Sequence, residues 1–114
     1  MICHLADAFR VASGIKQARP VANPFARTFI RWVALHTPMP WPHGVPTVPE
    51  VEQGKGGTPP GDWQRDCAEL QTLIHQFAER DKFGAHPIWG ELGRREWLVW
   101  GYRHTDHHLR QFGV

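Results

Sequence analysis

A stretch rich in proline and glycine divides the chain and limits where regular structure can form. Residues 38–61 hold seven of the ten prolines and five of the eleven glycines. Proline lacks the amide hydrogen that a helix interior or a central strand requires, and glycine favours turns. We therefore predict a loop of about 24 residues, long enough to be functional or mobile.

Helix signals flank this loop on both sides. Asn23 and Pro24 are typical of a helix start, with a capping side chain followed by proline at the first helical position. Helices are expected over residues 1–14, 25–36, 63–82 and 94–112. In the third of these, one apolar arc runs from Trp63 to Ala78. No strand pattern or internal repeat competes, so the sequence predicts an all-α fold with residues 1–114 as a single domain.

Composition excludes several classes of protein. The net charge of +2 and the absence of a basic stripe argue against a nucleic-acid partner. The longest apolar run, Trp32–Leu35, is far shorter than the roughly 20 residues of a spanning helix, so no membrane partner is expected. The first residues lack the pattern of a secretion signal, and two cysteines make no disulfide framework. These features predict a reduced, cytoplasmic protein.

Two histidines on the last expected helix form the strongest chemical signal. His104 and His108 lie one turn apart, about 40° from each other on a helical wheel, within the apolar arc that contains Trp97. Imidazoles in this arrangement can share one metal ion. No glutamate follows His104, so the general base of an HExxH protease is absent. A third ligand must come from another segment.

His4 is the best candidate for that ligand. It lies on the inward face of the first expected helix, in line with Ala8 and Val11. Three imidazoles from two helices predict an open site for zinc, nickel or iron, where a thiol or water becomes a nucleophile. The alternative stays open, because an inward-facing histidine is often only a core residue.

Three further histidines are expected to have roles other than metal binding. We expect His107 at the surface or behind the ligands, His75 in solvent and His86 in a structural turn. Trp41, inside the long loop, is expected to line a pocket.

Two aspartates are open to two interpretations. Asp7 and Asp106 either orient the ligand imidazoles or lie on solvated helix faces.

Four segments carry a resemblance to a known family. The runs Cys3–Ala8, His86–Gly90, Arg94–Trp97 and His104–Gly113 resemble the DinB/YfiT-like superfamily, closest to a branch with His-Pro-aromatic-Gly before the last helix. The resemblance covers essentially the whole chain and is specific at its two ends. It implies a four-helix up-down bundle with one divalent metal bound by three histidines, which here correspond to His4, His104 and His108.

The resemblance also implies an activity and a departure from the family pattern. Characterised members include transferases and isomerases that use low-molecular-weight thiols, which suggests a thiol and a small electrophile as partners. The family's first helix has no counterpart here, so the expectation is a truncated bundle of three main helices plus the long loop. The uncovered apolar face would then favour a homodimer.

Overall fold

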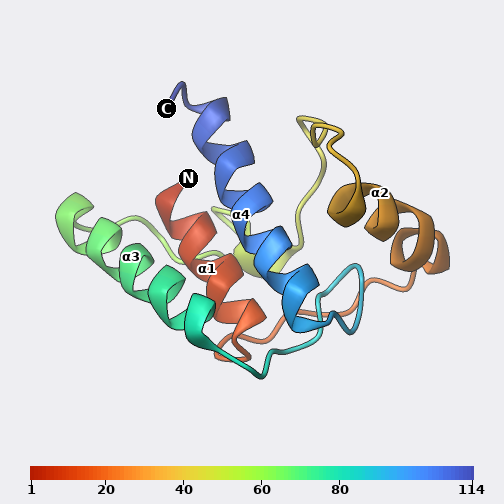
Figure 1. The fold of residues 1–114 in the computed structure, drawn as a ribbon. Coiled ribbons are helices and arrows are strands. Elements are labelled where there is room, and N and C mark those ends of the chain that lie inside the picture. Colours follow the sequence, from red (N-terminus) through yellow and green to blue (C-terminus); the bar gives the residue numbers. More distant parts are fainter.

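The structure, a computed structural model, describes residues 1–114 and is built from helices and loops (Figure 1). The elements in chain order are α1 (Ile2–Ala12), the π-helical turn η1 (Ala26–Ile30), α2 (Arg31–His36), the 3-10 turn η2 (Pro49–Val51), α3 (Trp63–Glu79) and α4 (Arg94–Gln111). The only bridge of β type joins His86 to Gly90. The all-α prediction is confirmed. The third helix ends at Glu79 instead of near Lys82, because Arg80 adopts extended backbone angles.

The capping signal at Asn23 acts as expected, and Asp62 caps α3 as well. The Asn23 side chain accepts a hydrogen bond from the Ala26 amide at 3.1 Å. Asp62 in the same way accepts from the Arg65 amide at 2.9 Å, which fixes the start of α3. Gly14 follows α1 with a φ of +74°, a conformation that glycine adopts without strain.

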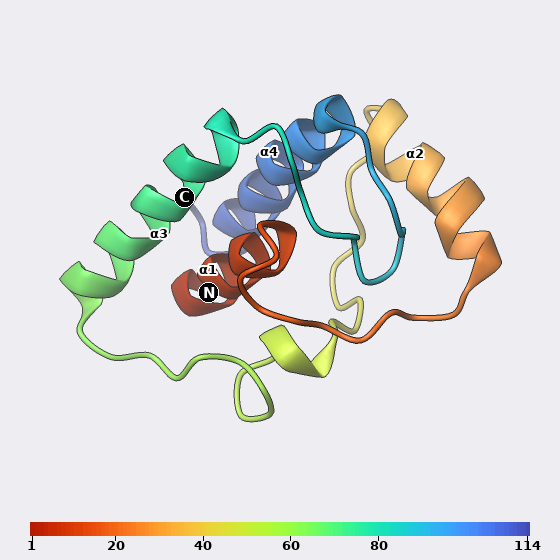
Figure 2. The ribbon, with the colours of Figure 1, turned by 90° about the horizontal axis from the view of Figure 1, so that it is seen from below.

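The three long helices, α1, α3 and α4, pack on one another, with α1 against both of the others (Figure 2). Aromatic side chains dominate the contact: Phe9 of α1 meets Phe77 of α3 and Trp100 of α4, at ring-centre distances of 5.0 and 5.6 Å. Gly101 permits the close approach, since a Cβ there would lie 2.7 Å from the Phe77 ring. The first turn of α1 therefore lies beside the last turns of α4.

Trp63, at one end of the apolar arc of α3, is not part of the core. Its side chain is 68% exposed. Cys3, at the start of α1, lies opposite Asp66, with Sγ 3.6 Å from the carboxylate. The first turn of α3 consequently projects beyond α1, and Ala78 at the other end is exposed as well.

The helix formed by η1 and α2 lies at the edge of the molecule (Figures 1 and 2). It contacts α4 through buried Ala34 and Leu35 and through an ion pair between Arg31 and Glu96. Its outer side exposes Phe25, Phe29 and Trp32. No helix in the structure combines the length and the apolar character needed to cross a membrane.

Candidate metal centre

The packing of α1 against α4 brings three imidazoles together. The ring of His4 lies 4.7 Å from that of His108 and 5.5 Å from that of His104, centre to centre. One ligand nitrogen from each residue lies within 4.8 Å of the other two. The Nε2 atoms of His104 and His108 are 3.0 Å apart, close to the roughly 3.3 Å between two nitrogens that share a tetrahedral zinc ion. The sequence thus identified three residues that do meet in space.

Two of the rings are oriented by partners outside the cluster. His4 Nδ1 lies 2.9 Å from the Val51 carbonyl oxygen, which can only accept a hydrogen bond. The proton therefore sits on Nδ1, and the Nε2 lone pair of His4 is free. His108 Nδ1 lies 2.9 Å from Gln111 Oε1 and is protonated on the same grounds. Backbone carbonyls and amide oxygens hold metal-binding histidines in this way.

These two partners were not predicted. Gln111 follows His108 by three residues on one helix, so helical spacing carries the signal that could have found it. The Val51 carbonyl had no such signal, because it comes from the long loop.

Burial keeps His104 and His108 neutral. It lowers the pKa of His104 well below the ordinary value of 6.5, and the nearby His108 and His4 add to the effect. Burial, with His4 again, lowers the pKa of His108 to about 4. Both imidazoles are therefore uncharged near pH 7, and the uncharged imidazole is the form that binds metal.

One ring nitrogen of the histidine cluster lacks the hydrogen-bond support expected of a metal ligand. The Nδ1 of His104 is buried and has no hydrogen-bond partner. The Nε2 of His104 donates to the unprotonated Nε2 of His108 at 3.0 Å, because His108 carries its own proton on Nδ1. Metal binding through His104 Nε2 would require the proton on Nδ1, which has no acceptor. The ring packs against Trp100, at 4.9 Å between ring centres.

The cluster opens into a cavity of about 530 Å³. Its walls are mostly apolar and aromatic, and include Trp41, Trp89, Trp100 and Phe112. Trp41 thus lines a pocket as predicted. Its indole Nε1 donates a hydrogen bond to the Ala34 carbonyl, which anchors the loop wall to α2.

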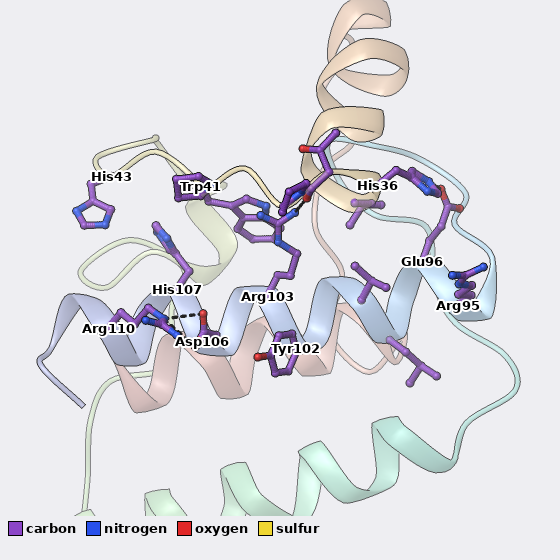
Figure 3. Close-up of a pocket in the computed structure, with 16 residues that line it drawn as sticks. His36, Trp41, His43, Arg95, Glu96, Tyr102, Arg103, Asp106, His107 and Arg110 are labelled. Carbon is purple, nitrogen blue, oxygen red and sulfur yellow. Dashed lines mark hydrogen bonds and ion pairs between the residues drawn. The ribbon is translucent and has the colours of Figure 1, made fainter.

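A second cavity, of about 950 Å³, lies between α4 and the segment after α2 (Figure 3). Arg103 of α4 reaches across it to the carbonyl oxygens of Ala34, Thr37 and Met39. His107 lines both cavities and packs edge-on against His43 at 5.2 Å. Its partial exposure agrees with the surface position expected for it.

The structure also places His75, His86 and Asp106. His75 is exposed on α3, as expected. His86 is buried, and its Nδ1 accepts hydrogen bonds from the amides of Ile88 and Trp89, which confirms the structural role. Asp106 pairs with Arg110 on the surface.

Both interpretations of Asp7 are wrong. It is fully buried, so it is not on a solvated face, and its partners are Arg10, Lys16 and Thr58, with no imidazole among them. Burial alone would raise the pKa of its carboxyl, but hydrogen bonds from Thr58, Lys16 and Arg10 outweigh burial and hold the pKa below its ordinary value.

Comparison with known proteins adds no relative. The chain matches no protein-family model, no curated protein and no solved structure.

Proposed function

We propose that this chain binds one divalent metal ion through His4, His104 and His108, with zinc or nickel as the best candidates and iron as a third. The observation that carries the proposal is the meeting of three imidazoles from the two ends of the chain at one wall of a cavity. Nitrogen ligands of this type suit these metals. Three protein ligands leave coordination positions for a further molecule.

We propose further that the chain is a DinB-like helical bundle that transfers a low-molecular-weight thiol to a small electrophile. The support is the resemblance of its two ends to that superfamily, together with the cavity beside the histidines. A metal ion supplies a Lewis acid that activates a thiol or water as a nucleophile. In the transfer, the thiolate sulfur bonds to the electrophilic carbon as the leaving group departs, and the thiol proton passes to solvent.

The residues of the chain have defined tasks in this proposal. The Val51 carbonyl and Gln111 orient His4 and His108, so that their Nε2 lone pairs remain available. Trp41 and Trp100 give the cavity an apolar wall that suits a small organic electrophile.

Metal content tests the site directly. The purified protein is expected to contain about one tightly bound divalent ion per chain, and His104→Ala and His108→Ala to contain none, since two imidazoles cannot complete the site. Elemental analysis after dialysis measures this. His75→Ala, which removes an exposed histidine from α3, is the matched control and keeps its metal. Full retention of metal in both α4 variants would disprove the assignment.

Activity separates transfer from a structural role. Metal-loaded protein is expected to speed the conjugation of small thiols to an alkyl halide or epoxide, and His104→Ala to act no faster than buffer. Mass spectrometry of the conjugate measures the rate, with His75→Ala again as control. Metal binding without any conjugation across a panel of thiols would instead support a non-catalytic helical module whose histidines are structural.

A further inference from the structure

A chain of short contacts runs from the buried carboxylate of Asp7 to the ligand His4, although the two side chains do not touch. The contacts pass through the segment 49–58, which begins with η2 and ends at Thr58. We propose that this segment is a latch that positions His4, with Thr58 and Gly57 as positioning residues. The inference rests on the proposed metal site and assigns residues to it outside the ligand set.

One end of the latch is bound to α1 by hydrogen bonds and an ion pair to the carboxylate of Asp7. Asp7 Oδ2 accepts a hydrogen bond from the Thr58 amide at 2.6 Å, and Oδ1 accepts from the Thr58 hydroxyl at 2.8 Å. Lys16 Nζ lies 2.9 Å from the same carboxylate and also donates to the Gly56 carbonyl at 2.9 Å. A buried carboxylate with this many donors is costly to leave unpaired, so the attachment is strong.

The body of the latch is folded tightly upon itself. The Gly56 amide donates to the Pro49 carbonyl at 2.8 Å, and the Gly57 amide donates to the Glu52 carbonyl at 2.9 Å. A Cβ at Gly57 would lie 2.7 Å from the Glu52 carbonyl oxygen. This oxygen belongs to the backbone, so the rotation of a side chain cannot relieve the clash. Only glycine fits there without moving the backbone between the two ends.

The other end of the latch holds the ligand. Val51 is buried, and its carbonyl accepts the Nδ1 proton of His4 at 2.9 Å. This hydrogen bond sets the tautomer and the direction of the ring. Movement of the backbone at Thr58 or Gly57 therefore changes where the Nε2 lone pair of His4 points, while His104 and His108 keep their positions on α4.

The test uses two changes in the latch and two matched controls. Thr58→Val removes a hydroxyl donor, and Gly57→Ala adds the clashing Cβ. Thr58→Ser keeps the hydroxyl, and Gly93→Ala places a Cβ where the nearest atom is 3.9 Å away. Zinc affinity is measured by competition with a chelator, and the visible spectrum of the cobalt(II)-loaded protein reports the number and geometry of ligands.

Thr58→Val and Gly57→Ala are expected to bind zinc about 10- to 100-fold more weakly, the usual effect of losing support behind a ligand. Their cobalt spectra should change, while both controls match the wild type. A folded Thr58→Val protein with wild-type affinity and spectrum would overturn the inference.

A metal-free measurement keeps this inference separate from the proposed function. Nitrogen NMR of the imidazoles in chelator-treated protein reports which nitrogen of His4 carries the proton. The wild type should show the Nδ1-protonated form, and Gly57→Ala and Thr58→Val should show a mixture. A wild-type protein that binds no metal would disprove the proposed function alone. A Thr58→Val protein that keeps the wild-type tautomer would overturn the latch, whether or not metal binds.

Discussion

The buried His86, which lies outside the histidine cluster, shows how strongly burial controls charge in this protein. His86 stacks on Trp89 with ring centres 4.5 Å apart and accepts two backbone hydrogen bonds through Nδ1. Burial lowers its pKa from 6.5 to about 3. The residue is therefore neutral in the folded protein over most of the acid range, whereas it takes up a proton near pH 6.5 in the unfolded chain.

This difference predicts acid sensitivity with a defined sign. Because the unfolded chain binds the proton first, the free energy of unfolding falls as the pH drops below 6.5, by at most about 1.4 kcal/mol per pH unit until about pH 3. His86→Asn keeps an acceptor near the position of Nδ1 and does not titrate. Between pH 7 and 5, metal-free wild type should lose about 2 kcal/mol more than this variant in denaturant unfolding.

The exposed His75→Asn is the control, and its loss of stability should match that of the wild type. Equal losses for wild type and His86→Asn would contradict the burial argument.

At the scale of the helices, one glycine controls how closely they pack. Gly101 faces both Phe77 of α3 and Phe9 of α1, and a Cβ there would meet their rings at 2.7 and 3.4 Å. Glycine inside a helix costs roughly 1 kcal/mol relative to alanine. Its presence in α4 is explained by packing, because a larger residue would push apart the helices that carry His4 and His104.

Gly101→Ala therefore tests two opposing effects. The gain in helix propensity is about 1 kcal/mol, and overpacking a tight core costs about 1–3 kcal/mol. We expect a net loss of about 1 kcal/mol in the free energy of unfolding, measured by urea denaturation. Phe77→Leu, which shortens the opposing ring, should make the same substitution neutral or stabilising. A stabilising effect of Gly101→Ala alone would show that the three helices are not in close contact here.

At the scale of the whole molecule, the histidine cluster joins the beginning of the chain to its end. His4 lies in the first turns of α1, and His108 lies near the end of α4. In the unfolded chain these residues are far apart, so a metal that binds all three favours the folded state. Such a metal would act as a cross-link between the two ends of the chain.

Added zinc should accordingly stabilise the protein. At a free concentration 100 times the dissociation constant, the expected gain is about 2.7 kcal/mol. Thermal unfolding at increasing zinc concentration measures the gain, and a chelator should reverse it. His4→Ala should lose most of the gain and His75→Ala should keep it. Equal stabilisation of all three proteins would indicate metal binding elsewhere.

Much of the local structure was accessible from the sequence. Asn23 and Asp62 each act on amides only three residues away, so their capping roles depend on nothing distant. The shared face of His104 and His108 follows from helical spacing alone. The same local reasoning failed for Trp63, whose face of α3 is apolar but whose side chain is exposed.

The sequence alone predicts the set of helices, about where each begins, and the inward direction of the three histidines, because these depend on neighbours within one or two turns. Three features depend on contacts between distant segments: Asp7 is buried against Thr58, the Val51 carbonyl orients His4, and the ends of α1 and α4 meet. Those contacts join residues about 50 to 100 positions apart. They depend on how the long loop closes, and its prolines and glycines show where it bends without showing what it will touch.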